Sequence, residues 1–447
     1  MSSDSAEPQA TKIRWLIVAM LMGFTFLGHF NRVSISVAGT ERFIKPGGLD
    51  MEQMGLVYSA FLLVYTLSML PGGWIIDRLG PRWALAGMGL GMGTCVALTG
   101  ALGWTGIPIA GMLVPLLMIR GIAGGMSVPL HPAAARSVSL WLPLSSRTTA
   151  NGLVTAGALI GIAVCFPVFG NLMDHFDWPR AFVICGVAMI AYSLAWLALS
   201  SDSVIDHPWT NFAERDMVKP ADQPDPRTRS TWREFLDLFH NRNLVLLTLS
   251  YAALSYFMYL FFYWLGAYFE KTLSLPVEDC RNATMTVHLA MAVGMVIGGI
   301  GTDFLGRKLG RRWGCRGIAM LGMSLSALLA WKGLSVADPT QVVWYFAFAL
   351  GSLGLVEGIF WTAAPQLEPR NGGLAGAFLN TIGNAGGLTA PYLTPVIASN
   401  FSWNAAIAVA CCSCGIGAIL WLWIDIDPNA ERITVHAPDV TAPEVVI

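Results

Sequence analysis

Long apolar segments, each about the length that crosses a lipid bilayer, follow one another through most of this chain. A membrane-spanning helix needs about 20 mainly apolar residues. Twelve segments qualify, and their centres lie near Gly23, Leu63, Gly93, Arg120, Ile160, Met189, Phe257, Val293, Ser324, Leu350, Gly386 and Ile416. A bilayer offers backbone groups no hydrogen-bond partner, so each segment is expected to form a helix. The sequence therefore predicts an all-α membrane protein with twelve transmembrane helices.

The composition fits a chain whose surface mostly faces lipid. Charged residues make up 12% of the chain, whereas a soluble globular protein has about 25%. The formal net charge of −1 gives no field that would attract nucleic acid. The eight cysteines show neither metal-ligand spacing nor a paired framework, so we expect no metal and no cofactor. The first apolar run lacks a signal-peptide cleavage pattern, and we interpret it as the first span.

One motif occurs twice, 226 positions apart in the chain of 447 residues. Residues 73–82 read GWIIDRLGPR and residues 299–308 read GIGTDFLGRK, and each copy closes an apolar segment and opens a basic loop. Repetition at half the chain length indicates a duplicated membrane protein. We expect six-helix bundles at 1–199 and 244–426, a polar cytoplasmic linker at 200–243 and a tail at 427–447.

The placement of Lys and Arg predicts the orientation. With both termini in the cytoplasm, nineteen of these residues fall in inner segments and six in outer ones, the bias that cytoplasmic loops show. Both motif copies then lie at the inner face. There we expect Asp77, Arg78, Arg82 and Asp303 to act in gating, because an aspartate at a helix end can accept bonds from backbone and arginine.

Two arginines lie within apolar spans, Arg32 in the first and Arg120 in the fourth. An ionised side chain at mid-bilayer is costly and is tolerated mainly when it faces a cavity or a partner. Arg32 could instead extend towards the nearer membrane face. Neither span contains a carboxylate, so a substrate carboxylate, which a guanidinium binds through two hydrogen bonds, is the expected counter-charge.

Other polar residues in the spans are candidates for the same cavity. Glu357 is the only acidic residue deep in the second half, and it could couple transport to protons or be a structural carboxylate. His29 precedes Arg32 by three residues and so lies on roughly the same helix face; a membrane histidine can also be a packing residue. We expect His29 also to bind substrate, together with Tyr65, Tyr259, Trp361, Asn380 and Asn384. Tyr259 belongs to a stripe with Tyr256, Tyr263 and Trp264 that ordinary packing could also explain.

The chain contains no G-x-x-x-x-G-K-[ST] nucleotide loop, nor a nucleophile elbow or zinc motif. ATP-driven pumping and enzymatic activity are therefore not expected.

Several stretches carry a family resemblance. They are residues 31–38 (NRVSISVA), 55–61 (GLVYSAF), Tyr65, 71–74 (PGGW), 151–152 (NG), 360–361 (FW) and 380–387 (NTIGNAGG). Together with the repeated motif, they resemble the anion:cation symporter family of the major facilitator superfamily, which includes bacterial sugar-acid transporters and sialin-type carriers. The resemblance implies two rocking six-helix bundles and an organic-anion substrate carried with protons. Arg32 and Arg120 match the family's anion-binding arginines.

The chain departs from the family pattern at positions where other members often have proton-carrying residues. Asn31 stands where an aspartate is common, Ser127 where proton-linked members often have glutamate, and Ala158 where galactonate-type members have glutamine. If coupling is retained, we expect it at Glu357 or His29, with Glu357 ranked slightly ahead.

The expected function is secondary transport of a small organic anion, a sugar acid or related carboxylate, by a monomer in a bacterial inner membrane. The alternatives are an uncoupled facilitator, a carrier of aromatic or dicarboxylic acids, and a transporter-like nutrient sensor.

Overall fold

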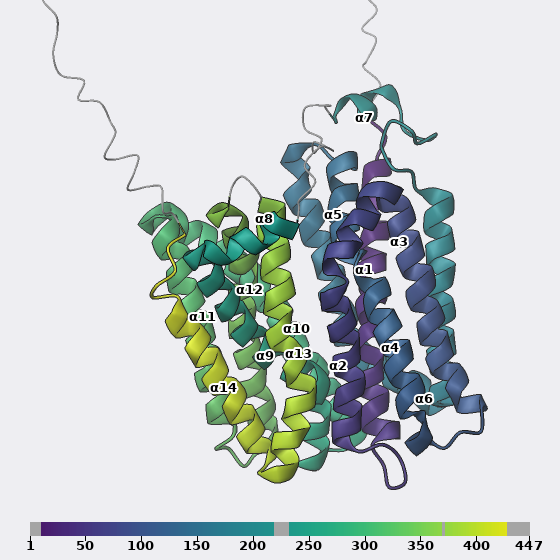
Figure 1. Ribbon diagram of the computed structural model, residues 1–447, viewed down its shortest axis with the longest axis vertical. Coiled ribbons are helices and arrows are strands. Elements are labelled where there is room, and N and C mark those ends of the chain that lie inside the picture. The colour runs from purple at the N-terminus through teal and green to yellow at the C-terminus, as the bar shows by residue number, and fades with distance from the viewer. Residues whose placement is uncertain (1–9, 219–231, 369–371, 427–447) are drawn as a thin grey trace, which may run out of the picture.

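The computed structural model describes residues 10–218, 232–368 and 372–426, and in these ranges the chain is helical without strands. Figure 1 shows two groups of long helices side by side. The first group consists of α1 (Ile13–Ala38), α2 (Met51–Leu67), α3 (Met69–Ala101), α4 (Leu113–Ser127), α5 (Leu130–Trp141) and α6 (Leu144–Leu199). The second consists of α9 (Arg242–Lys271), α10 (Val277–Leu309), α11 (Arg311–Gly333), α12 (Pro339–Leu367), α13 (Gly372–Asn400) and α14 (Trp403–Leu420).

Short elements connect these helices. They are η1 (Gly39–Phe43), η2 (Leu102–Trp104), η3 (Ile109–Met112), α7 (Phe212–Asp216), α8 (Trp232–Asp237) and η5 (Leu238–His240). We call the end of the bundle where α1 begins and α14 ends the terminal end; α7 and α8 lie there in Figure 1. The other end is called the opposite end.

Nine helices of the described residues are long and apolar enough to cross a membrane. One of them, in α6, is two helices joined at Asp177, where φ is 64°. The 17-residue α2 runs through Ser68 into the start of α3, and α13 has 29 residues. Each of the twelve expected segments falls on one of these helices or part-helices. The count of twelve itself, like the bounds of the four predicted segments, stays a prediction.

Polar residues at the membrane edge begin several of these helices. Asp50 and Gln53 form a reciprocal capping box at the start of α2, with bonds of 2.7 and 3.0 Å. Asn241 and Ser402 accept backbone N–H bonds at the first turns of α9 and α14. Such caps satisfy N–H groups that have no partner inside the helix.

The turn glycines of the two halves adopt the same conformation. Gly80 (φ 79°, ψ 160°) separates the two spans that share α3, and Gly310 (φ 83°, ψ 149°) separates α10 from α11. The sequence repeat pairs Gly80 with Gly306 instead. The second copy therefore continues as helix for one more turn before the chain reverses, a difference that the motif spacing did not predict.

Candidate functional site

Arg32 and Arg120 lie next to each other in the first half. Arg120 is buried, with 3% of its surface exposed, and its Nη2 donates to the backbone carbonyl of Arg32 at 3.0 Å. The ring of Phe61 contacts both side chains, with its centroid 5.1 Å from Arg32 Cζ and 4.7 Å from Arg120 Cζ. Neither arginine has an ion pair among the described residues, and Arg120 Nε is buried without a hydrogen-bond partner there. Two close positive charges thus share one aromatic ring and have no carboxylate partner among the described residues.

A glycine brings Arg120 to this ring. A Cβ on Gly124, one turn after Arg120 in α4, would lie 2.1 Å from the backbone oxygen of Phe61 in α2. Only glycine allows the two helices to approach so closely. The guanidinium of Arg120 therefore reaches over the Phe61 ring.

A chain of hydrogen bonds links Arg32 to the second half. Arg32 Nη2 donates to Tyr259 Oη at 2.9 Å, and Tyr259 Oη donates to Asn384 Oδ1 at 3.0 Å. Asn384 Nδ2 in turn donates to Asn380 Oδ1 at 2.6 Å. Asn380 Nδ2 lies 3.3 Å from the sulfur of Met69 in the first half. The structure thus joins Arg32, Tyr259, Asn380 and Asn384, which the sequence placed on three separate spans.

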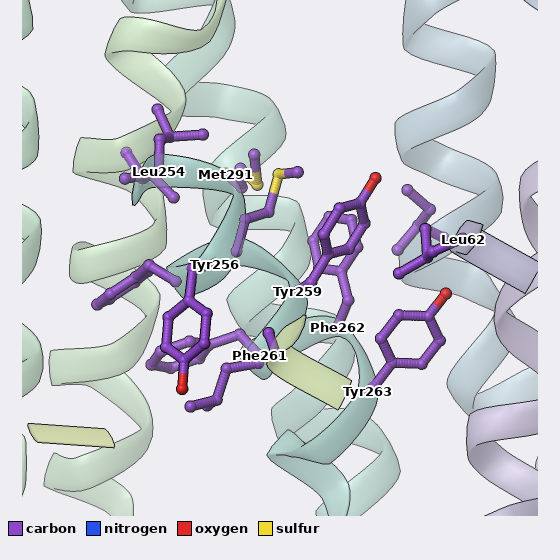
Figure 2. Close-up of a cluster of buried hydrophobic side chains, with 14 of the residues drawn as sticks. Leu62, Leu254, Tyr256, Tyr259, Phe261, Phe262, Tyr263 and Met291 are labelled. Atoms are coloured by element: carbon purple, nitrogen blue, oxygen red, sulfur yellow. The ribbon is translucent and has the colours of Figure 1, made fainter. Parts of the chain in front are cut away.

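The tyrosine stripe of α9 divides in the structure. Figure 2 shows the hydroxyls of Tyr259 and Tyr263 directed towards the helix that carries Leu62, whereas Tyr256 points away from it. Tyr263 stacks on Tyr58 of α2 with ring centroids 4.9 Å apart. Only part of the stripe therefore faces the first half.

Glu357 lies in a separate cluster within the second half. Its Oε1 accepts from Tyr251 Oη at 2.9 Å and from Trp361 Nε1 at 3.2 Å. Its Oε2 is buried without a partner among the described residues, and no ion pair joins Glu357 to a cation there. Trp361 is thus placed against Glu357, and neither has a bond to Arg32 or Arg120 in the described ranges.

His29 shares a pocket with Arg32 and with a residue that the sequence did not place there. The pocket is lined by Gly28, His29, Arg32, Phe61, Tyr65, Ser127, Leu130 and His131. His131 Nε2 lies 3.5 Å from His29 Nε2. His131 was not among the expected site residues, because the break between α4 and α5 at Val128 and Pro129 could not be located from composition.

A network of charged residues joins the two halves at the opposite end. Arg281 of α10 is 5% exposed and pairs at 2.6 Å with Glu41 Oε2 and with Asp174 Oδ2, both in the first half. Arg42 pairs with Asp174 at 2.7 Å. In the sequence, Arg42 and Arg281 were only two of the six basic residues expected in outer segments. Their ion pairs depend on how the two halves of the molecule meet.

The profile of the Major Facilitator Superfamily matches residues 21–371 and, in a second overlapping match, residues 305–443. The chain belongs to the Major Facilitator Superfamily. It is a multi-pass integral membrane protein of a transporter family and not an enzyme, as the sequence predicted.

Curated relatives of this superfamily member carry organic anions. A probable galactarate/D-glucarate transporter of Bacillus subtilis is 27% identical, over 89% of this chain and 88% of that protein. A D-galactonate transporter of Escherichia coli O6:H1 is 25% identical over 88% and 91%. A probable sulfoacetate transporter of Cupriavidus necator is 25% identical over 86% and 87%. Sugar-acid carriers are the proteins that the sequence motifs resemble.

Solved structures agree with the fold. A bacterial homologue of the human lysosomal transporter Spinster, crystallised in an inward-facing and occupied conformation, matches with a TM-score of 0.73. The match covers 93% of this chain and 97% of that one, at 14% identity. At this identity the likeness shows the arrangement of helices alone.

The superfamily's repeated loop motif occupies the terminal end in both halves. Arg82 donates its backbone N–H to Asp202 at 3.2 Å and its side chain to the carbonyl of Leu197, which ties the α3 turn to the end of α6. Arg78 and Asp303 are exposed. The side chain of Asp77 lies outside the described residues, so its gating role stays a prediction.

Proposed function

We propose that this protein is a secondary transporter of a small organic anion of the sugar-acid type. The relatives named above are transporters of galactarate, D-glucarate, D-galactonate and sulfoacetate, all of which carry at least one carboxylate. The shared fold and length support a related substrate for this chain. The identity of the individual acid is left to experiment.

The observation that carries the proposal is the pair of adjacent arginines without carboxylate partners. A guanidinium binds a carboxylate through two parallel hydrogen bonds, and Arg120 has a buried Nε without a partner among the described residues. Tyr65 and Tyr259 lie beside Arg32, and Asn384 and Asn380 follow Tyr259 in the hydrogen-bond chain. These four residues offer groups that can bond to substrate hydroxyls. A sugar acid needs both kinds of contact.

Transport would proceed by alternating access. The hydrogen-bond chain from Arg32 to Asn384 crosses between the halves, so a substrate bound there contacts both bundles. We propose that the terminal end faces the cytoplasm of a bacterium, as the Lys and Arg bias predicts, and that the protein acts as a monomer with proton coupling. His29 and Glu357 are the coupling candidates that the sequence provides.

Uptake into proteoliposomes tests this proposal. The purified protein would be given labelled galactarate, D-glucarate, D-galactonate, a hexuronate and sulfoacetate, with and without an imposed pH gradient. Saturable uptake of one acid, inhibited by the unlabelled acid, is the expected result. Saturable uptake that never exceeds the outside concentration would identify an uncoupled facilitator. No exchange of any acid in the panel would contradict the proposal.

A further inference from the structure

Two histidines on different helices face each other beside Arg32. His29 of α1 and His131 of α5 have ring centroids 5.1 Å apart, at an angle of 63°. Their Nε2 atoms are 3.5 Å apart. Both line the pocket that also contains Arg32. No part of the arginine site described above requires this pair.

The backbone fixes the protonation pattern of His29. Its Nδ1 lies 3.0 Å from the carbonyl oxygen of Thr25. A carbonyl oxygen only accepts hydrogen bonds, so Nδ1 carries a hydrogen. In the neutral ring, Nε2 is then the nitrogen with a free lone pair, and it is this atom that faces His131. A proton added to the pair would therefore lie at Nε2, between the two rings.

His131 is the more exposed member of the pair. The His29 ring is half-buried, whereas His131 is exposed and lines the same pocket. A proton can therefore come from water in the pocket to His131 and be shared with His29. No bond other than N–H is made or broken, and the proton returns to water when the pocket opens on the other side.

The charges around the pair link its proton to the anion site. Arg32 on α1 is the charged group that lines the pocket, and it follows His29 by three residues, so its positive charge lies close to both histidines. The other helices contribute Phe61 and Tyr65 from α2, Ser127 from α4 and Leu130 from α5, and none of the pocket residues is a carboxylate. Arg32 opposes a positive charge on the pair, and an anion bound at Arg32 removes that opposition. Substrate and proton then favour each other's binding.

We propose that His29 and His131 together form the proton-binding site that couples transport, and that Glu357 does not. This inference rests on the proposed transport of an organic anion. It adds His131 as a residue that binds the proton jointly with His29.

The test separates substrate exchange from proton-driven accumulation. Wild type and His131→Gln protein would be compared in proteoliposomes with labelled D-glucarate or, failing uptake of D-glucarate, the panel acid taken up fastest. Exchange of labelled for unlabelled acid at equal pH needs no net proton movement and should stay within about threefold of wild type. Accumulation driven by an alkaline interior should fall at least tenfold, to the level without a gradient. A pH-sensitive dye inside the vesicles should report loss of substrate-dependent acidification.

His29→Asn provides the second variant, because its amide can still donate to the Thr25 carbonyl while the Nε2 position is lost. It should lose gradient-driven accumulation, as His131→Gln does. His288→Gln is the matched control: His288 is a buried histidine of α10 whose Nδ1 makes the same kind of bond, 2.8 Å to Thr284 O. This control and Glu357→Gln should both retain gradient-driven accumulation.

Accumulation at wild-type level in both His131→Gln and His29→Asn would overturn the assignment, as would loss of accumulation in Glu357→Gln alone. A wild-type protein that exchanges the acid but never accumulates it would overturn the coupling and leave the anion site intact. Failure of wild type to exchange any panel acid would instead overturn the proposed function itself.

Discussion

At the scale of single residues, the contacts of Arg120 decide how well its side chain can bind a carboxylate. Its charge and its spacing within the fourth span were visible in the sequence, but its contacts were not. It is held over Phe61 and against the backbone of Arg32, so its guanidinium has little freedom to rotate. A pre-positioned planar group loses less entropy when it binds a carboxylate.

Replacing Arg120 with lysine should therefore weaken substrate binding although the charge is kept. A charge-assisted hydrogen bond contributes about 1.5–3 kcal/mol, so loss of the two-pronged contact should raise Kd by roughly 10- to 100-fold. Isothermal titration of purified protein measures this change. Arg316→Lys is the control, because Arg316 donates to the Ile424 carbonyl at 2.7 Å, away from the site. Wild-type affinity in Arg120→Ala protein would exclude Arg120 from the site.

At the scale of elements, the two copies of the loop motif place their turn glycine at different positions of the motif. Gly80 and Gly310 share a left-handed conformation although the repeat aligns Gly80 with Gly306. The motif therefore predicts the position of the chain reversal with an uncertainty of one helical turn. What fixes the turn is the residue that can adopt positive φ without strain.

Gly80→Ala should lower the midpoint of thermal unfolding. With φ 79° and ψ 160°, Gly80 lies in a region essentially open to glycine only, where another residue costs about 1–3 kcal/mol, and a Cβ here would also lie 2.9 Å from Asp202 Oδ1. Gly87→Ala in the same helix is the matched control, since its Cβ would meet nothing within 4 Å. Alanine is the better helix former by about 1 kcal/mol, so this control should be neutral or stabilising. Equal midpoints for the two variants in detergent would show that the Gly80 turn is unstrained.

Asp77 is the aspartate of the first copy of the loop motif. We expect Asp77→Asn to slow substrate exchange in vesicles while equilibrium binding in detergent stays near wild type, because the residue is predicted to act on the change of state. Asp303→Asn, at the exposed position of the second copy, allows the two halves to be compared. A parallel loss of binding and exchange in Asp77→Asn would assign the residue to the site or to folding instead.

At the scale of the whole molecule, the charged network at the opposite end holds the halves together. Arg281 belongs to the second half, and its two carboxylate partners, Glu41 and Asp174, belong to the first. Removing one partner of a buried ion pair is costly because it leaves a buried charge without compensation. A state in which this end is open has to break these bonds.

Arg281→Met should therefore increase the population of the state in which the two halves are separated at the opposite end. Spin labels at Lys45 and Lys332 (each replaced by cysteine in a background without reactive cysteines) would report longer distances than in the parent protein. Arg42→Met is the matched control: Arg42 bonds the same Asp174, but both residues lie in the first half. A distance distribution that is unchanged in Arg281→Met, or equally changed in Arg42→Met, would contradict a role in holding the halves together.

The sequence alone determined the class of the molecule and the location of its costly groups. Apolar length, the Lys and Arg bias and the 226-residue repeat are properties of segments, so they predicted a helical membrane protein and identified Arg32, Arg120 and Glu357 without a structure. Membership of the superfamily confirms that class. These inferences succeed because a bilayer constrains each span separately.

Only the tertiary structure decided which of these groups meet. Arg281 and Glu41 are 240 residues apart and His131 and His29 are 102 apart, and no local pattern relates them. Their contacts depend on helix rotation and on close approaches such as the one at Gly124. Packing of one helix on another fixes these features. For this reason the sequence could only rank Glu357 slightly ahead of His29, whereas the fold gave His29 a histidine partner and placed Glu357 with Tyr251 and Trp361.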